Sequence, residues 1–252
     1  MRVLRGFDFR RGTTVIHKVD PRAKLIYVAL FTALTILYAN PLVLLLLFAS
    51  TLPLVMVAKV AGRWGQSIRG SYLFLVLIFI FNFIVLYFQK NDIFGAALTS
   101  VSMVIRFITL ISLFSTFFLT TAPEDLTQSM VQMKIPYDYA LTFNMAMRFV
   151  PTLSREAQII VDAQKSRGLE MEKGNLVQKI RNYIPVLVPL IVSSFRRAEL
   201  VADAMESRAF GASKKRTSLY VLTMQSRDYL FILISVAAFL LILSLRIFLG
   251  IL

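Results

Sequence analysis

An uncharged run of 34 residues, from 25 to 58, limits how this chain can fold more than any other feature. A single helix of that length would extend about 50 Å, whereas the hydrocarbon core of a bilayer is about 30 Å thick. Asn40-Pro41 lies inside the run, and this pair favours a turn. The run therefore predicts two membrane spans, at about 23–39 and 41–58, joined as a tight hairpin.

Three further runs have the length and composition of membrane spans. One is interrupted only by Arg106 and another only by Arg246, and we interpret each cation as reaching toward the membrane surface or facing a partner. Residues 183–194 are also apolar, but about 12 residues are too few to cross a bilayer. We therefore expect an all-α integral membrane protein with about five transmembrane helices, and the 57% hydrophobic composition agrees. The three further runs are 71–89, 96–122 and 229–252.

Basic residues alternate between the two ends of the spans and predict the orientation of the chain. The segment before the uncharged run carries seven Lys and Arg residues, the turn at Asn40 carries none, and the next connection carries three. Because basic loops stay in the cytoplasm, we place the N-terminus inside and the C-terminus outside. The same rule accounts for the net charge of +14. The predicted parts are a cytoplasmic basic N-terminus at 1–22, a four-span membrane domain at 23–122, a cytoplasmic domain at 123–228 and a final span at 229–252.

Residues that catalysis or ion transport would need are scarce. The chain has no Cys and a single His, His17, so we expect no metal site and no catalytic nucleophile with its base. It has no G-x-x-x-x-G-K-[ST] motif, so we expect no cofactor on this chain and an energy source on a partner. The spans hold no Asp, Glu or His, which disfavours the alternative function of a self-contained carrier or channel. A membrane-embedded enzyme or scaffold is the third hypothesis. Nucleic-acid binding is not expected, because the sequence has no surface of interleaved basic and aromatic residues outside the apolar runs.

The region 123–228 is charged, yet it carries two long patterns of apolar residues. In each pattern the apolar residues recur at steps of three and four, which predicts two amphipathic helices with an apolar stripe. Pro151, Pro185 and Pro189 lie inside the patterns and are expected to bend the helices locally. The stripes include Phe149, Leu153 and Ile160 in the first helix and Leu187, Ile191 and Phe195 in the second.

A short phrase occurs at the end of both patterns. Residues 162–168 read Asp-Ala-Gln-Lys-Ser-Arg-Gly, and 41 positions later residues 203–209 read Asp-Ala-Met-Glu-Ser-Arg-Ala. On one interpretation each Arg is a helix C-terminal cation, favourable by roughly 0.3–1 kcal/mol, with left-handed caps at Gly168 and Gly211. The repeat favours a second, compatible interpretation, in which small neighbours leave each guanidinium on a slim tip that docks in a groove of a partner. The candidate docking residues are Ser166, Arg167, Gly168, Ser207, Arg208 and Ala209.

Three ordered motifs resemble those of a known family. Residues 17–25, His-Lys-Val-Asp-Pro-Arg-Ala-Lys-Leu, resemble the opening of the transmembrane coupling (T) subunit of energy-coupling-factor (ECF) transporters, the cobalt-transporter permease family. Residues 120–126, Thr-Thr-Ala-Pro-Glu-Asp-Leu, resemble a family stretch after the fourth span, and the two tips resemble the family's paired Ala-Arg-Gly signatures. Ser166 and Ser207 stand where Ala is usual, and Ala209 stands where Gly is usual, although Ala tolerates a positive φ poorly.

The resemblance implies a non-catalytic coupling subunit in the plasma membrane of a prokaryotic cell. It implies two ABC-type ATPase subunits as partners, with Arg167 and Arg208 each docking in a groove of one ATPase. It also implies a small membrane substrate-binding (S) subunit for a vitamin or metal ion, which the apolar stripes and the membrane helices would grip. ATP-driven closure of the ATPases would then move the long cytoplasmic coupling helices and reorient the S subunit.

Overall fold

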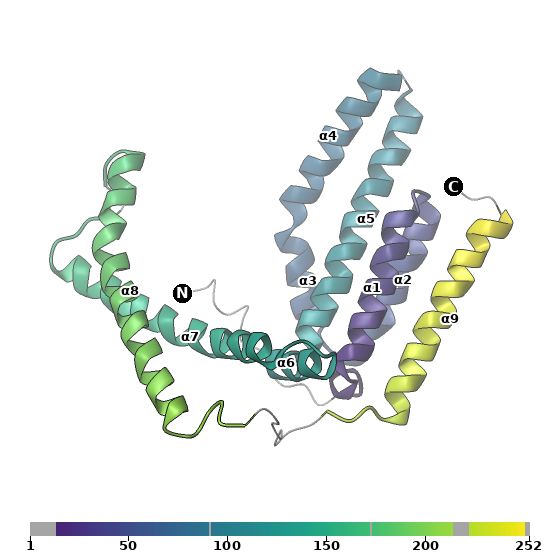
Figure 1. Ribbon diagram of the computed structural model, residues 1–252. Coiled ribbons are helices and arrows are strands. Elements are labelled where there is room, and N and C mark those ends of the chain that lie inside the picture. Colours follow the sequence, from purple (N-terminus) through teal and green to yellow (C-terminus); the bar gives the residue numbers. More distant parts are fainter. Residues whose placement is uncertain (1–13, 91, 172, 214–221, 250–252) are drawn as a thin grey trace. The chain divides into compact units, whose positions relative to one another are not determined.

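Helices form all the regular secondary structure in the described part of the chain (Figure 1). The computed structural model describes residues 14–90, 92–171, 173–213 and 222–249, and none of these residues lies in a strand. The elements in chain order are η2 (Ile16–Lys18), α1 (Pro21–Leu37), α2 (Pro41–Ala58), α3 (Ala61–Gly70), α4 (Tyr72–Lys90), α5 (Ile93–Thr120), α6 (Pro123–Gln132), α7 (Tyr137–Ser166), α8 (Leu176–Glu206) and α9 (Ser226–Leu249).

Four helices, α2, α4, α5 and α9, are long and apolar enough to cross a membrane. The remaining predicted span, 23–39, corresponds to α1, which has 17 residues. At 1.5 Å per residue α1 extends about 25 Å, at the short end of the range for membrane spans. It packs against α5 and α9, so it belongs to the same bundle. The prediction of an all-α membrane protein is confirmed, and the chain is a multi-pass membrane protein.

Polar caps set where the first two membrane helices begin. Asn40 accepts a hydrogen bond from the N–H of Leu42 at 2.9 Å, and Pro41 takes the first helical position of α2. Asp20 caps α1 in the same way through the N–H of Arg22, also at 2.9 Å. Each cap satisfies an N–H group that the helix itself leaves without an acceptor. The hairpin predicted at Asn40-Pro41 therefore has a local physical cause.

The core of the membrane bundle lies between α1, α2, α5 and α9. Helix α5 packs against α1, α2, α3 and α4, and α1 packs against α9 (Figure 1). Because lipid tails are as apolar as these side chains, close packing holds such helices together more than withdrawal from water does. The buried core residues are Tyr27, Val28, Phe31, Leu34, Tyr38, Leu44, Leu47, Leu113, Phe117 and Ile242.

Polar contacts also join helices within this bundle. Arg106 on α5 donates from Nη2 to the carbonyl of Tyr38, the residue that ends α1, at 2.6 Å. The guanidinium thus satisfies a helix-end carbonyl, a role that the sequence did not reveal. On α3, Trp64 donates from Nε1 to Oγ of Ser112 at 3.0 Å, and Thr51 on α2 lies 2.8 Å from the same oxygen. These bonds connect four of the helices.

The chain divides into two compact units. The described residues up to Lys134 group with those from Leu222 onward, and the described residues between them form the second unit. Helix α6 begins at Pro123, which suits a first helical position, with Glu124 and Asp125 in its first turn, where acids are favoured, and it packs on α1 and groups with the membrane helices. Helix α3 was not predicted, and the side chain of Arg246 lies outside the described side chains.

Candidate functional site

The first copy of the repeated phrase ends α7 in a tight turn. The N–H of Gly168 donates to the carbonyl of Lys165 at 2.9 Å, and the N–H of Leu169 donates to the carbonyl of Gln164 at 3.0 Å. This pair of bonds is the Schellman motif, which requires one residue in the left-handed conformation. Gly168 takes that position with a φ of 86°, as the sequence predicts.

The second copy ends α8 with the same two bonds. The N–H of Ala209 donates to the carbonyl of Glu206 at 2.9 Å, and the N–H of Phe210 donates to the carbonyl of Met205 at 3.0 Å. Ala209 holds the left-handed position with a φ of 58°. The expectation that Gly211 is this cap is therefore wrong, because Gly211 lies in the turn that follows. Replacing Gly by Ala adds strain but leaves the turn unchanged.

All six candidate docking residues are exposed. The hydroxyl of Ser166 donates to the carbonyl of Asp162 at 3.0 Å, and the hydroxyl of Ser207 donates to the carbonyl of Ala204 at 3.1 Å. Each serine therefore returns its polar group to its own helix. In the described part of the chain, neither Arg167 nor Arg208 forms an ion pair. Each tip thus presents an unpaired guanidinium with small neighbours, an arrangement suited to multi-donor contacts.

Helices α7 and α8 pack in opposite directions, which separates the two tips (Figure 1). Gln164 contacts Pro185, whereas Glu156, earlier on α7, contacts Arg197, later on α8. The tip at Arg167 therefore lies near the level of Pro185. Arg208 is 23 residues farther along (208 − 185), or about 35 Å at 1.5 Å per residue. The unit thus offers two similar cationic tips at widely separated points.

A proline creates one of the bonds that position the first tip. Pro189 has no N–H, so the carbonyl of Pro185, four residues earlier, lacks its usual helical donor. Gln164 on α7 donates to that carbonyl from Nε2 at 3.3 Å. Nearby, Asn182 on α8 donates from Nδ2 to the carbonyls of Glu170 at 3.0 Å and Lys173 at 3.3 Å. These bonds fasten the end of α7 and the following loop to α8, which the apolar pattern did not predict.

An ion pair marks the other end of the contact between α7 and α8. Arg197 donates from Nη2 to Oε2 of Glu156 at 2.6 Å. A hydrogen bond from the Ser193 hydroxyl, followed by the bond from Arg197, holds the pKa of Glu156 below its usual value. Glu156 is therefore charged at neutral pH, and its bond to Arg197 connects α7 to α8.

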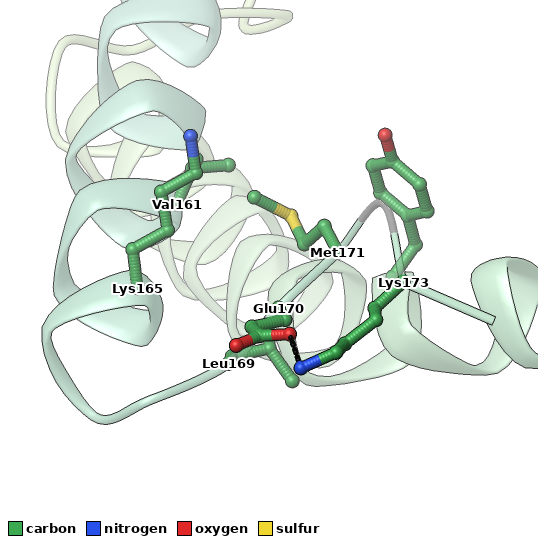
Figure 2. Close-up of a pocket in the computed structure, with 7 residues that line it drawn as sticks. Val161, Lys165, Leu169, Glu170, Met171 and Lys173 are labelled. Atoms are coloured by element: carbon green, nitrogen blue, oxygen red, sulfur yellow. Dashed lines mark ion pairs between the residues drawn. The ribbon is translucent and has the colours of Figure 1, made fainter.

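A hollow of about 830 Å³ lies beside the first tip (Figure 2). Val161 and Lys165 on α7 form one wall, and Met171 from the loop forms another. At the rim, Lys173 pairs with Glu170 at 2.6 Å, so the charges of these two residues offset each other. The hollow is thus lined by both apolar and charged side chains, and Lys165 is one of the charged ones. Its lining residues are Val161, Lys165, Leu169, Glu170, Met171, Lys173 and Tyr183.

The predicted apolar stripes differ in their exposure. Leu187, Ile191 and Phe195 on α8 are about half to two-thirds exposed, at 49%, 52% and 69%. On α7, Phe149, Leu153 and Ile160 are half-buried. Among the described residues of α8 only Val186 is buried, so the helix carries its apolar side chains largely without cover. A continuous exposed apolar face of this kind indicates a partner surface.

The motifs at 17–25 and 120–126 meet at the base of the membrane unit. Lys24 is 5% exposed and donates from Nζ to the carbonyl of Thr120 at 2.8 Å. Asp228, at the start of α9, accepts from the N–H of Asp20 at 3.1 Å and from the N–H of Gln225 at 2.7 Å. These bonds fasten the starts of α1 and α9 to the end of α5. Residues of both motifs therefore help to hold these helix ends together at the base of the membrane unit.

His17 also lies at this base of the membrane unit. Its Nδ1 lies 2.7 Å from Oγ1 of Thr14. Burial, and next the charge of Lys24, lower the pKa of His17, so the imidazole is neutral at physiological pH. The described residues contain no group of three or more His, Cys, Asp or Glu side chains placed to hold a metal ion.

Comparison with known proteins identifies relatives along most of the chain. The family model CbiQ, described as "Cobalt transport protein", matches residues 12–219. The chain is 32% identical over 244 residues to the "Energy-coupling factor transporter transmembrane protein EcfT" of Streptococcus equi subsp. equi (strain 4047), covering 89% of this chain and 90% of that protein. It is 34% identical over 242 residues to the protein of the same name in Lactococcus lactis subsp. cremoris (strain MG1363), covering 88% and 90%. A third relative of that name, from Staphylococcus aureus (strain 04-02981), is 33% identical over 231 residues and covers 84% and 86%.

Proposed function

Because this chain belongs to the CbiQ family of cobalt transport proteins, we propose that it is the transmembrane coupling component of an energy-coupling factor transporter. In this role it has no catalytic site of its own. It links two ABC-type ATPase subunits to a small membrane subunit that binds a vitamin or a metal ion. The N-terminus and the unit of α7 and α8 face the cytoplasm, where ATP is available to the ATPases.

The observation that carries this proposal is the pair of arginine tips. Arg167 and Arg208 each lie in a turn of the Schellman type, and both are exposed. They are about 35 Å apart along α8. A pair of ATPase subunits offers two similar grooves, one on each subunit, so two similar tips at separate points fit such a pair. A guanidinium in a groove donates several hydrogen bonds in one plane, which an ammonium does not reproduce.

The exposed face of α8 supports the second partner. Leu187, Ile191 and Phe195 recur at steps of four on this helix and stay exposed. A membrane subunit has apolar side chains available to cover such a face. When ATP closes the ATPases, the tips move, and α7 and α8 carry that movement to the substrate-binding subunit as rigid elements.

The decisive experiment removes both guanidinium groups. The variant Arg167→Ala plus Arg208→Ala is produced together with the two ATPases of the transporter, and the complex is purified in mild detergent. We expect at least a tenfold loss of ATPase from the purified complex, because buried arginines are frequent hot spots of interfaces. Arg196→Ala removes an exposed Arg from the middle of α8, between the two tips, and serves as the matched control.

The amount of protein inserted into the membrane is measured for every variant. Normal insertion with lost ATPase supports docking through the tips. A double variant that keeps ATPase at the level of the control would show that the ATPases bind elsewhere on the chain.

A further inference from the structure

The two tips share one backbone but differ in two flanking side chains. The last turn of α7 carries Lys165, and the equivalent position of α8 carries Glu206. After the left-handed residue, the first tip has Leu169 and the second has Phe210. Because the hydrogen bonds of the two turns match, these side chains occupy equivalent places around the arginine. The two tips therefore have the same backbone structure but differ in the charge and shape of their side chains.

Helix stability explains the lysine but not the glutamate. The C-terminal end of a helix carries partial negative charge, which favours Lys165 and disfavours Glu206. Both side chains are exposed, and in the described part of the chain neither forms an ion pair. Glu206 thus stands where local energetics oppose it. Helix stability therefore gives no reason for an acid at this position.

The surroundings extend the difference between the tips. Lys165 and Leu169 both line the hollow beside the first tip (Figure 2). The second tip instead has Phe210, which is 40% exposed. Asp162 and Asp203 hold equivalent exposed positions in the two copies, so the charge difference between the tips comes from Lys165 and Glu206. The first tip is therefore basic and concave, whereas the second is acidic and bears an aromatic ring.

We propose that Lys165 and Glu206 are specificity-determining residues that direct each tip to a different ATPase groove. The groove for Arg167 presents a carboxylate to Lys165 and an apolar side chain that enters the hollow. The groove for Arg208 presents a cation to Glu206 and an apolar depression for Phe210. The two tips are then not interchangeable. This inference rests on the proposed docking of the tips to ATPases.

Charge reversal at one tip at a time tests the inference. Lys165→Glu gives the first tip the charge of the second, and Glu206→Lys does the converse. Each variant is produced at full length with both ATPases, and ATPase association is measured at two salt concentrations. We expect each reversal to weaken association at least fivefold at low salt, because like charges then face each other, and less at high salt. Arg196→Glu, at an exposed site in the middle of α8 between the two tips, makes the same charge change and is expected to leave association unchanged.

Glu206→Lys separates a contact from a folding effect. The lysine suits the helix end, so amide hydrogen exchange in the last turn of α8 is expected to slow while ATPase association weakens. If Glu206 acted only on helix stability, Glu206→Lys would slow amide exchange in the last turn of α8 and also strengthen ATPase association. That result, or wild-type association in both charge reversals, would overturn the inference. If Arg167→Ala plus Arg208→Ala still abolishes association in that case, docking stands and only the distinction between the tips is wrong.

Discussion

Gly168 and Ala209 hold the same left-handed position in the turns that end α7 and α8, with φ angles of 86° and 58°. The two backbone hydrogen bonds that close each turn have the same lengths, 2.9 and 3.0 Å. The shared feature of the repeat is therefore a backbone turn that presents an arginine. An L-residue other than Asn or Asp rarely adopts this conformation, so Ala209 carries strain that Gly168 does not.

Exchanging these two residue types is expected to change the stability of the helix ends in opposite directions. Ala209→Gly relieves the strain and should stabilise the turn after α8 by about 1 kcal/mol, whereas Gly168→Ala should destabilise the turn after α7 by about as much. The measurement is amide hydrogen exchange at Phe210 and Leu169, whose N–H groups close the two turns. Equal exchange in wild type and Ala209→Gly would show that Ala209 is not strained.

The bond from Gln164 to the carbonyl of Pro185 is expected to depend on Pro189. Gln164→Ala removes the donor, and because water reaches this exposed site the cost should be about 0.5–1 kcal/mol. Pro189→Ala restores an N–H that bonds the same carbonyl within α8. In that background Gln164→Ala should cost almost nothing. A double-mutant cycle on the thermal unfolding of the purified protein measures this coupling, and strictly additive effects would contradict the shared carbonyl.

Acid is expected to loosen α7 from α8 through Glu156. Its folded pKa lies below the usual value because Ser193 and Arg197 bond the charged form. A lowered folded pKa means that the stabilisation is fully present above the pKa of an unfolded Glu and is lost as pH falls through the folded pKa. Spin labels on cysteines at Thr152 and Leu200, both exposed, measure the spread of distances between the helices as pH falls. In Glu156→Gln the distribution of distances between the labels should already be broad at neutral pH and should change little as pH falls.

Local signals in the sequence predicted the membrane bundle well. Asn40-Pro41 divided the longest apolar run at the residue where α2 begins, because both the cap and the proline act on their immediate neighbours. The repeat likewise predicted two helix ends. Each of these features depends on residues within a few positions of each other.

Contacts between distant segments were beyond such reasoning. Lys24 and Thr120 belong to two motifs that the sequence singled out, but only the fold brings them to 2.8 Å. Nothing in the sequence pointed to Gln164. Its acceptor, the carbonyl of Pro185 on α8, is available only because Pro189 has no N–H to bond it. The cap at Ala209 was missed since a glycine two residues later, Gly211, is the better candidate by residue type alone.

Cysteine labelling is expected to place α8 and the turn before α2 on opposite sides of the membrane. The chain has no native Cys, so a single introduced thiol reports one position. Lys179→Cys on α8 is exposed and should react with a membrane-impermeant maleimide only after the cytoplasmic side is opened, because the basic loops lie inside. Gly174, nearby, is unsuitable because its φ is 99° and an added Cβ would lie 2.3 Å from Oε1 of Gln178. Ala39→Cys, exposed in the hairpin turn, should react in intact cells and is the matched control. Reaction of Lys179→Cys in intact cells would invert the orientation and remove the tips from the compartment that holds ATP.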